Sequence, residues 1–595
     1  MNILFLTTAH NSLSQRLLIE LTERGHKITV SIADGEAAML GAVARENPDL
    51  IIAPMLKAAI PEEIWSKRVC LIVHPGIMGD RGPSSLDWAI AEGAPRWGVT
   101  VLQAAAEMDA GPIWASHEFP LPQVADAKGS LYRNEVTEAA VKGVLEAVEK
   151  FESRRFRPVP LDYARPEMRG RLRPTMAQKD RAIDWARDRT DEVVRKLRAA
   201  DSAPGVLDSI FGLPVFLYGA HNEDRLKGAP GAVIAQRDGA ICRATVDGAV
   251  WITHLKLKRE ASHDADRRFA KQGYAYCDAE FRPISGIKLP ATQILGPLMR
   301  GVPEAVLPVV AELDCRSYRE IRYVERDGVG HIYFDFYNGA MSTEQCYRLR
   351  DAFLFARSRP TRVIVLQGGK DFFSNGIHLN VIEAADDPAV ESWRNINAID
   401  DVVYEILNTM SHIVVASLRG NAGAGGAILA LAADKVFARD GVVFNPHYKG
   451  MGGLYGSEYW TYVLPRRVGA PRAQELTEAC RPMGTDEAKR IGFVDGVFAG
   501  DVAGFERQVA AQAASIASRG DFWNLLRDKH ERRVNDERAK PLAAYRAEEL
   551  AKMKVNFFGP DAAYHRAREN FVFKGRAPAA KADRSSAPER LSHAV

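Results

Sequence analysis

The sequence predicts an α/β protein of several domains, and three observations support this. Two long stretches, residues 1–165 and 326–500, alternate short apolar runs with helical patterns, which is typical of parallel sheets covered by helices. Between them, residues 166–260 contain short apolar runs separated by Gly and Asp, which is typical of a small β-barrel. At 595 residues the chain is also too long for one hydrophobic core.

The first stretch, residues 1–165, is predicted to be a Rossmann-like domain. A helix with a leucine-rich face is expected over residues 13–24. Buried parallel strands are expected over residues 3–6, 27–32, 49–53 and 70–73. Ligands of such open sheets bind beyond the carboxyl ends of the strands. His74 directly follows one predicted strand, so chemistry is expected there.

The second stretch, residues 166–260, is predicted to be a small β-barrel of the OB-like type. A helix is expected over residues 191–200. Strands are expected over residues 212–217, 232–234 and 250–252. The proline-containing segment 261–325 is predicted to be a linker that packs against its neighbours.

The third stretch, residues 326–500, is predicted to be a second α/β domain. A helix is expected over residues 342–356, and strands over residues 330–336, 363–366, 413–416 and 442–444. Residues 501–575 are rich in Arg, Lys, Glu and Ala, so C-terminal helices are expected there. Residues 576–595 combine Ala, Ser, Pro and charged residues, and this tail is predicted to be disordered.

The composition is that of an ordinary soluble globular protein. Hydrophobic residues make up 46% of the chain, charged residues 26%, and the net charge is only +3. This balance gives no case for binding nucleic acid or a membrane, and no apolar run approaches the ~20 residues of a membrane span. The start of the chain lacks the basic segment of a signal peptide, and six scattered cysteines form no Cys-x-x-Cys pair. A cytoplasmic protein without a disulfide framework is therefore expected.

The first motif of chemical interest pairs His74 with Asp109. An acyl transfer requires a stabilised oxyanion and a proton that moves. A histidine can serve both needs when a carboxylate holds its tautomer. A lone histidine at a strand end is usually structural, and the residues around this one change that expectation.

Residues 1–260 resemble the formyl-tetrahydrofolate formyltransferases, the family of methionyl-tRNA formyltransferase. The resemblance rests on Val-His-Pro-Gly-Ile-Met-Gly-Asp-Arg-Gly-Pro at 73–83, Met-Asp-Ala-Gly-Pro-Ile at 108–113 and Ile-Asp-Trp at 183–185. It implies that His74 and Asp109 match the catalytic histidine and aspartate of that family. It also implies that 10-formyl-tetrahydrofolate binds beside Met55, Leu56, Ile72 and Ile113.

Ile72 marks a departure from this family, which carries an Asn two residues before the histidine. That amide would donate to the developing oxyanion, and losing one such donor typically costs about 100-fold to 1000-fold in rate. Two interpretations stay open. Either the site is degenerate, or its acceptor is a thiol, a better nucleophile that needs less help. An apolar side chain at this position would also suit the passage of a small formyl group.

The second motif combines two glycine-rich turns, residues 373–377 and 420–426. Glycines let the backbone approach a ligand, and a helix N-terminus adds a positive dipole, which together suit an oxyanion. In these turns and in residues 337–342, the third stretch resembles the crotonase superfamily of enoyl-CoA hydratases and isomerases. The resemblance implies that the Ile377 and Gly425 N–H groups hold the carbonyl oxygen of a CoA thioester. Weaker matches imply CoA contacts from Ala340, Lys370 and Leu379.

The crotonase-like stretch lacks the two glutamates with which the hydratases activate water. Ile428 and His447 stand at their positions, so hydration of an enoyl-CoA is not expected. Tyr448 and Glu458 are the remaining candidates for proton transfer, although core packing is the commoner role of a single aromatic residue. No metal site is expected, since no two histidines show helical ligand spacing.

The order of the parts is similar to that of the HoxX family of [NiFe]-hydrogenase maturation proteins, which fuse these two halves. The similarity covers nearly the whole chain and is close over residues 451–460. It implies formyl transfer from 10-formyl-tetrahydrofolate to coenzyme A, followed by decarbonylation of formyl-CoA to carbon monoxide, a ligand of the hydrogenase iron. The implied partners are these small molecules and the [NiFe]-hydrogenase maturation machinery. The lost residues fit this scheme, because formyl-CoA has no α-carbon and must be kept from water.

Two other hypotheses stay open. One is an acyl-CoA enzyme of the crotonase class whose N-terminal half only binds folate or a nucleotide. The other is a non-catalytic assembly factor that docks on a hydrogenase precursor. Formation of carbon monoxide, and its dependence on His74, distinguishes these hypotheses from the two-step scheme.

Overall fold

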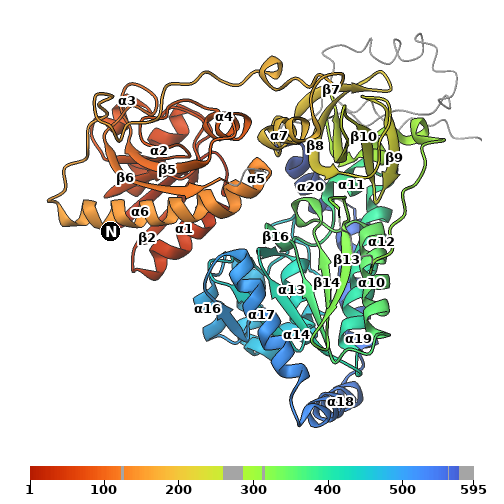
Figure 1. Cartoon of the computed structure of the whole chain (residues 1–595). Coiled ribbons are helices and arrows are strands. Elements are labelled where there is room, and N and C mark those ends of the chain that lie inside the picture. The colour runs from red at the N-terminus through yellow and green to blue at the C-terminus, as the bar shows by residue number, and fades with distance from the viewer. Residues whose placement is uncertain (122–125, 259–285, 311–314, 561, 575–595) are drawn as a thin grey trace, which may run out of the picture.

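The computed structural model describes residues 1–595 except 122–125, 259–285, 311–314, 561 and 575–595. It shows an N-terminal α/β domain, a rolled antiparallel sheet, and a second α/β domain followed by helices (Figure 1). This architecture confirms the predicted fold class. The tail predicted for residues 576–595 lies outside the described residues.

The N-terminal domain is built on a six-stranded sheet in the order β2-β1-β3-β4-β5-β6. The first four strands are parallel, as predicted, whereas β5 and β6 run antiparallel. His74 is the last residue of β4 rather than the residue after it. The strands are β1 (Asn2–Thr7), β2 (Lys27–Ile32), β3 (Leu50–Ala53), β4 (Cys70–His74), β5 (Arg96–Gln103) and β6 (Ile113–Pro120).

Helices cover both faces of this sheet because successive residues of a strand point to opposite sides. Ile3 and Phe5 of β1 pack into the core beneath α1 and α6, whereas Leu4 and Leu6 pack toward α2 and α3. The helices are α1 (Ser12–Glu23), α2 (Glu36–Glu46), α3 (Glu62–Trp65), α4 (Ser85–Ala91), α5 (Lys128–Leu131), the π-helical turn η1 (Tyr132–Val136) and α6 (Thr137–Ser153).

The middle part is an antiparallel sheet in the order β7-β8-β11-β10-β9, with β12 also paired to β11. Its apolar face closes on α7 and α9. β12 and α9 lie in the predicted linker, and their apolar residues belong to this core. The sequence of this segment shows no periodic pattern that predicts its place in the core. The elements are α7 (Thr190–Ala200), β7 (Val206–Ile210), β8 (Leu213–Glu223), β9 (Val233–Arg237), β10 (Ala240–Ala244), β11 (Ala249–Leu257), β12 (Lys288–Pro290), α9 (Ala291–Leu295) and the 3₁₀ turn η3 (Gly296–Met299).

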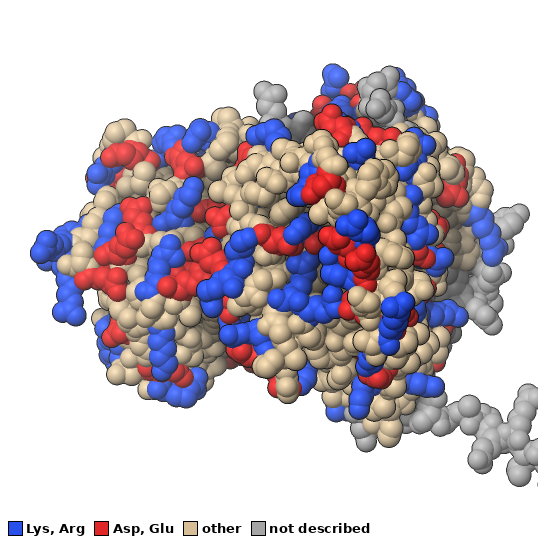
Figure 2. Space-filling model, turned by 90° about the horizontal axis from the view of Figure 1, so that it is seen from below, with Lys and Arg blue, Asp and Glu red and all other residues tan. Residues whose placement is uncertain are grey.

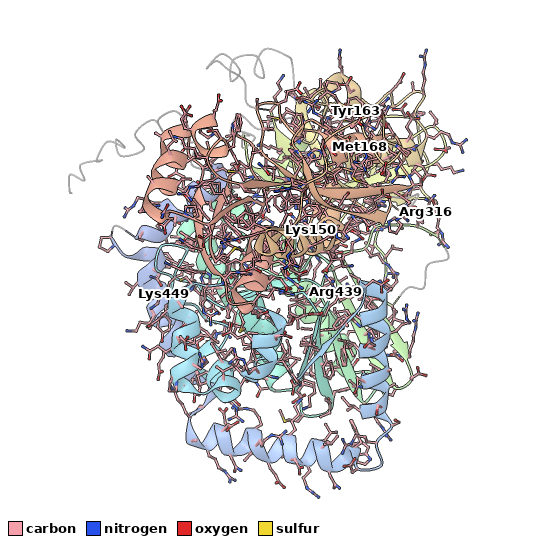
Figure 3. The ribbon with its side chains drawn as sticks, turned by 90° about the vertical axis from the view of Figure 1, so that its left-hand side faces the viewer. Lys150, Tyr163, Met168, Arg316, Arg439 and Lys449 are labelled. Atoms are coloured by element: carbon pink, nitrogen blue, oxygen red, sulfur yellow. The ribbon has the colours of Figure 1, made fainter. Side chains whose placement is uncertain are left out.

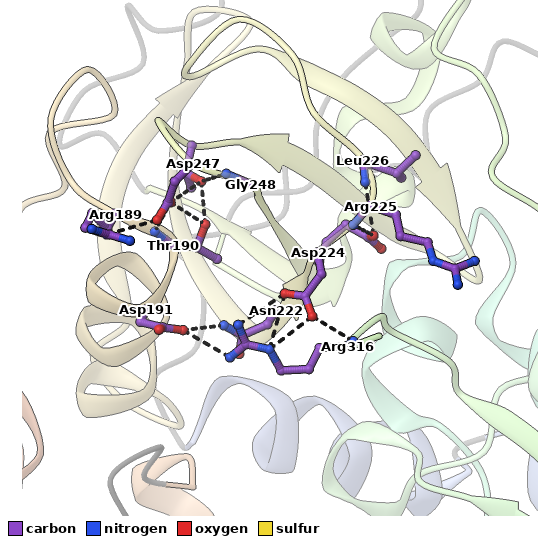
Figure 4. Close-up of polar contacts among 12 residues, drawn as sticks. Arg189, Thr190, Asp191, Asn222, Asp224, Arg225, Leu226, Asp247, Gly248 and Arg316 are labelled. Atoms are coloured by element: carbon purple, nitrogen blue, oxygen red, sulfur yellow. Dashed lines mark hydrogen bonds and ion pairs between the residues drawn. The ribbon is translucent and has the colours of Figure 1, made fainter. Parts of the chain in front are cut away.

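Two carboxylates secure the surface of this middle part (Figure 4). Asp247 accepts hydrogen bonds from the N–H and hydroxyl of Thr190, at the first residue of α7. Asp224 accepts from the backbone N–H of Arg316 at 2.9 Å and pairs with its guanidinium, which lowers the pKa of Asp224. Arg316 thereby ties the segment that leads to the second α/β domain back onto the sheet.

The second α/β domain contains two sheets. In the larger one, in the order β13-β14-β15-β17-β19-β21, only β13 and β14 run antiparallel, and the smaller one pairs β16, β18 and β20 in parallel. The first strand starts at Ile321, within the predicted linker. The strands are β13 (Ile321–Arg326), β14 (Val329–Phe334), β15 (Val363–Gln367), β16 (Phe372–Ser374), β17 (Ile413–Leu418), β18 (Asn421–Gly423), β19 (Lys435–Arg439), β20 (Phe444–Asn445) and β21 (Gly496–Phe498).

The large sheet lies between two groups of helices. One face packs on α10, α12 and α13, and the other on α17 and α18. The C-terminal region is helical as predicted. The helices are η4 (Tyr337–Gly339), α10 (Thr343–Arg357), α11 (Leu379–Ala384), α12 (Pro388–Leu407), α13 (Gly425–Leu431), α14 (Trp460–Val468), α15 (Ala470–Ala479), α16 (Thr485–Arg490), α17 (Val502–Ala517), α18 (Phe522–Ala539), α19 (Leu542–Phe558) and α20 (Ala563–Phe573).

Polar clusters hold the N-terminal domain to the other parts. Toward the middle part, the buried Asp87 carboxylate accepts from Lys128 Nζ at 2.9 Å and from Arg181 Nη1 at 3.1 Å. Toward the second α/β domain, α5 and η1 contact Asp371, which lies between β15 and β16.

Lys/Arg and Asp/Glu side chains are interspersed over the face shown in Figure 2. None of the helices in the described ranges is long and apolar enough to cross a membrane.

The Asp87 cluster gives a stability prediction. Asp87→Ala leaves two cations, Lys128 and Arg181, buried without their carboxylate, which typically costs about 3–5 kcal/mol. The unfolding transition of the N-terminal half should therefore move to lower denaturant concentration, measured by intrinsic fluorescence. Glu478→Ala removes the partner of the exposed Lys449 (labelled in Figure 3) and should leave the transition in place. If the two variants shifted the unfolding transition equally, burial of the Asp87 cluster would not account for its contribution to stability.

Candidate functional site

His74 lies buried between two carboxylates at the end of β4. Its Nε2 is 3.0 Å from Asp80 Oδ2, and its Nδ1 is 3.5 Å from Asp109 Oδ2. Asp109 has a left-handed backbone, with φ of 54°, and accepts from the Gly82 N–H at 3.1 Å. The structure therefore brings together the predicted pair and adds a second carboxylate on the other ring nitrogen.

Sequence reasoning missed Asp80, although it falls inside the quoted motif at 73–83. The turn after β4 folds back, so Asp80 reaches the ring of a histidine six residues earlier. Gly76 allows this, because a Cβ there would collide with both the Asp80 carboxylate and the His74 ring. The sequence offers one indication of this role, a carboxylate a few residues after the histidine. Only the fold of the turn shows that this carboxylate reaches the histidine ring.

The residues expected around a folate gather at the same end of the sheet. Ile72 pairs with Ala53 on β3 and with Leu102 on β5, and Leu102 pairs with Ile113 on β6. Met55 and Leu56 follow β3 after Pro54. The register thus places the apolar side chains that were predicted to contact folate beside the strand that ends at His74. Ile72 lies on the same face of β4 as His74, two residues away.

The second site forms where two glycine-rich turns meet. One turn follows β16 and contains Ile377, and the other follows β18 and begins α13 at Gly425. Gly376, with φ of 74°, packs so closely that a Cβ there would lie 3.2 Å from the Gly425 nitrogen. The first N–H of a helix has no intrahelical partner, so the Gly425 N–H is available to a ligand. The geometry therefore suits an oxyanion held by backbone donors.

Glu458 and Tyr448 lie at this junction, as candidates predicted from sequence. A side chain at position 425 would collide with the Glu458 carboxylate, and Tyr448 Oη donates to Glu458 Oε2 at 2.9 Å. Glu458 and Tyr459 both have left-handed backbones, with φ of 60° and 57°. Such strain in non-glycine residues persists only where surrounding contacts enforce it, and it is common at functional sites.

Asp400 of α12 enforces this conformation. Its carboxylate accepts from the Ser457 hydroxyl at 2.8 Å and from the Glu458 N–H at 2.8 Å, and it is fully buried. Arg546 Nε of α19 lies 3.7 Å away, and Glu549 accepts from the Thr461 N–H at 2.8 Å. Sequence reasoning missed Asp400 and Glu549, because they lie on distant helices and belong to no motif.

Burial changes the protonation of these groups. Desolvation, together with the charge of Asp400, raises the pKa of Glu458 to about 8, so its carboxyl is largely neutral at pH 7. Desolvation first, and then the carboxylate of Glu458, raises the pKa of Tyr448 well above its ordinary value, so this phenol does not ionise near neutral pH. Of the two predicted proton carriers, only Glu458 changes its charge near neutral pH.

The three residues predicted to bind CoA lie in different places around the second site. Lys370 forms an ion pair with Asp126, and the adjacent Asp371 accepts from Ser130 Oγ at 2.6 Å. Ala340 follows η4 and is half-buried, and Leu379 begins α11 and packs against the domain core. Of the three, Lys370 lies at the junction of the two halves.

The positions predicted for the missing hydratase glutamates hold no carboxylate. Ile428 is fully buried in the core, and desolvation lowers the pKa of His447. Among the residues that the structure describes, no three His, Cys, Asp or Glu side chains are arranged to hold a metal ion.

The fold and the two sites define a formyltransferase fused to a crotonase-type α/β domain. Models of the protein families agree with this class: Formyl transferase matches residues 29–148, Formyl transferase, C-terminal domain, matches residues 175–272, and Enoyl-CoA hydratase/isomerase matches residues 326–554. A methionyl-tRNA formyltransferase of Roseiflexus castenholzii is 30% identical over 30% of this chain and 55% of that protein.

The similarity to hydrogenase maturation proteins spans the whole fusion. The hydrogenase maturation factor HoxX of Bradyrhizobium diazoefficiens is 48% identical over 96% of this chain and 95% of that protein. A crystal structure of HypX from Aquifex aeolicus in complex with tetrahydrofolic acid has a TM-score of 0.89 and 47% identity, covering 96% of each chain. A variant of the same HypX has a TM-score of 0.89 and 46% identity, covering 97% of this chain and 98% of that one. This chain belongs to the HoxX family of hydrogenase maturation factors.

The buried carboxylates give a pH prediction. Desolvation raises the pKa of Glu549 to about 8, so the folded state retains its proton where the unfolded chain, near 4.5, has lost it. The contribution of this group to the free energy of unfolding should therefore fall as pH rises from about 4.5 to 8, by up to about 1.4 kcal/mol per pH unit. Glu549→Gln removes this loss, so its melting temperature relative to wild type should rise with pH.

The exposed neighbour Glu548 provides a matched control for that measurement. Glu548→Gln leaves the buried cluster unchanged, so its melting temperature should follow that of the wild type at every pH. A constant difference between Glu549→Gln and wild type from pH 5 to pH 8 would contradict a buried, protonated Glu549.

Proposed function

We propose that this protein makes carbon monoxide for [NiFe]-hydrogenase maturation in two steps. The N-terminal half transfers a formyl group from 10-formyl-tetrahydrofolate to coenzyme A, and the second α/β domain cleaves formyl-CoA into carbon monoxide and coenzyme A. The observation that carries the proposal is the placement of Glu458 against the Gly425 turn, in a site without the two water-activating glutamates. The tetrahydrofolate complex of the Aquifex protein supports folate as the formyl donor.

In the first step one proton is transferred and the formyl carbon exchanges its bond to nitrogen for a bond to sulfur. The thiol sulfur of coenzyme A attacks the formyl carbon, and His74 takes the thiol proton. The bond between the formyl carbon and N10 of the folate breaks as the tetrahedral intermediate collapses, and His74 returns the proton to N10. The products are formyl-CoA and tetrahydrofolate. A thiol acceptor also explains how Ile72 is tolerated where the formyltransferases carry an amide donor.

The second step moves the formyl hydrogen from carbon to sulfur. The Ile377 and Gly425 N–H groups hold the carbonyl oxygen, and ionised Glu458 removes the formyl proton as the bond from carbon to sulfur breaks. The proton then passes to the thiolate, which leaves carbon monoxide and coenzyme A. A base with a pKa near the working pH combines a useful ionised fraction with strong basicity. Tyr448 orients the carboxylate and stays neutral.

The junction between the halves supports passage of a CoA thioester. Lys370, which is predicted to contact CoA at the second site, forms an ion pair with Asp126 of the N-terminal domain. The adjacent Asp371 is bound by Arg133 of η1. Elsewhere in the same junction, Asn445 Nδ2 donates to Gln15 Oε1 of α1 at 2.7 Å. Asn445 is three residues before Tyr448. The arrangement supports one coenzyme A serving both sites across this boundary.

Separate assays of the two steps test the proposal. His74→Ala should abolish tetrahydrofolate release from 10-formyl-tetrahydrofolate plus coenzyme A, but should retain carbon monoxide formation from added formyl-CoA. Glu458→Gln should show the reverse, with a loss of about 100-fold or more in carbon monoxide formation. If His74→Ala made as much carbon monoxide as wild type from the folate donor, the two-step scheme would be wrong.

The protonation of Glu458 gives a pH prediction for the second step alone. Because the ionised form is the base and its pKa is about 8, carbon monoxide formation from formyl-CoA should rise with pH and reach half its plateau near pH 8. Headspace gas analysis of single-turnover reactions from pH 6 to pH 10 measures this. A rate that falls as pH rises through 8 would assign Glu458 the role of an acid instead.

A further inference from the structure

The segment that connects the N-terminal domain to the middle part crosses directly over the turn at 75–82. Tyr163 Oη donates to the Gly79 carbonyl at 3.0 Å, the Gly170 N–H donates to the Met78 carbonyl at 2.8 Å, and the Arg173 N–H donates to the Arg81 carbonyl at 2.9 Å. Tyr163 and Met168 mark this segment in Figure 3. The contact is so close that a side chain on Gly170 would collide with the backbone of Asp80.

This crossing brings Arg173 to the Asp80 carboxylate. Arg173 Nε lies 3.4 Å from Asp80 Oδ1, and its Nη1 lies 2.6 Å from Glu92 Oε1. The Asp80 side chain is fully buried and that of Arg173 is 12% exposed. Within the described ranges, neither Asp80 Oδ1 nor Arg173 Nε has a hydrogen-bond partner, so their ion pair is what compensates these two atoms. Asp80 lies within the motif at 73–83, whereas Arg173 lies outside it.

Asp80 and Asp109 compete for the protons of one imidazole. A neutral ring carries one N–H, so it donates to one carboxylate and presents a lone pair to the other. Asp80 is closer to His74, at 3.0 Å against 3.5 Å, and the Arg173 guanidinium lies beside it. The other nearby cation, Arg81, is directed to Glu107 and to the Met108 carbonyl instead. The geometry therefore favours the N–H on Nε2 and the lone pair on Nδ1.

We propose that Asp80, held by Arg173, is the positioning residue that fixes His74 in the tautomer protonated at Nε2. Nδ1 then exchanges the proton of formyl transfer: it accepts the thiol proton as the carbon–sulfur bond forms, and returns it to N10 as the carbon–nitrogen bond breaks. Asp109, facing Nδ1, stabilises the imidazolium between these two events. This inference rests on the proposed function, and it reassigns the orienting carboxylate from Asp109 to Asp80.

Three variants test the assignment. Asp80→Asn keeps the shape but offers an amide that can donate to Nε2, which favours the wrong tautomer. Arg173→Met removes the charge that holds Asp80. Arg171→Met is the matched control, because Arg171 lies on the same segment and also pairs with Glu92, but is 69% exposed and does not contact Asp80.

Both damaging variants should lower kcat for tetrahydrofolate release, Asp80→Asn by about 100-fold to 10,000-fold, with little change in KM for the folate. The control should behave as wild type. Carbon monoxide formation from added formyl-CoA should be retained in all three variants, which shows that the chain is folded. If wild type itself released no tetrahydrofolate in the presence of coenzyme A, the proposed function would fail rather than this inference.

A spectroscopic measurement separates orientation from a structural role. In protein labelled with ¹⁵N-histidine, with the His74 signal assigned by its loss in His74→Gln, wild type should show the tautomer protonated at Nε2. Asp80→Asn should shift it toward protonation at Nδ1. A wild-type His74 already protonated at Nδ1 alone, or an Asp80→Asn variant with normal kcat, would overturn the assignment.

Discussion

The carboxylate of Asp371 anchors the N-terminal domain to the second α/β domain. Ser130, Arg133 and Asn134 of the N-terminal domain all donate to it, at 2.6, 2.9 and 3.0 Å. Asp371 directly precedes β16, and the turn after β16 carries Ile377. Consequently, the N-terminal domain is anchored a few residues from a donor of the second site. A fixed junction is compatible with the proposed sharing of one coenzyme A between the two sites.

The two resemblances imply the same kind of departure at both sites. Each site would lack a polar group that its family uses, the amide at position 72 in the first site and two glutamates in the second. Each has instead a buried carboxylate on a strained or tightly packed turn: Asp80 beside His74, and Glu458 beside Gly425. A second carboxylate or a cation outside the site, Asp400 or Arg173, then sets the geometry of that group. In both sites the position of a buried carboxyl group is thus set by packing and by a neighbouring charged side chain rather than by solvent.

The sequence predicted most of the fold because buried parallel strands are short apolar runs, as in β1, β3 and β17. It did not predict that β12 and α9 belong to the middle part, because the pairing of β12 with β11 and the packing of α9 on the same core depend on residues far away in the chain. Among the site residues, His74, Asp109, Gly425, Tyr448 and Glu458 fall in motifs, and the structure brings each group together. Asp80, Arg173 and Asp400 acquire their significance only through a turn, a crossing segment and a helix contact, none of which leaves a periodic pattern.

In the proposed reaction, one carbon atom passes from folate to carbon monoxide without hydrolysis to formate. It is tested most directly by supplying 10-formyl-tetrahydrofolate labelled with ¹³C in the formyl group, together with coenzyme A, and measuring every labelled product. We expect one ¹³CO for each tetrahydrofolate released, and none without coenzyme A. Labelled formate in place of ¹³CO, in the presence of coenzyme A, would contradict it.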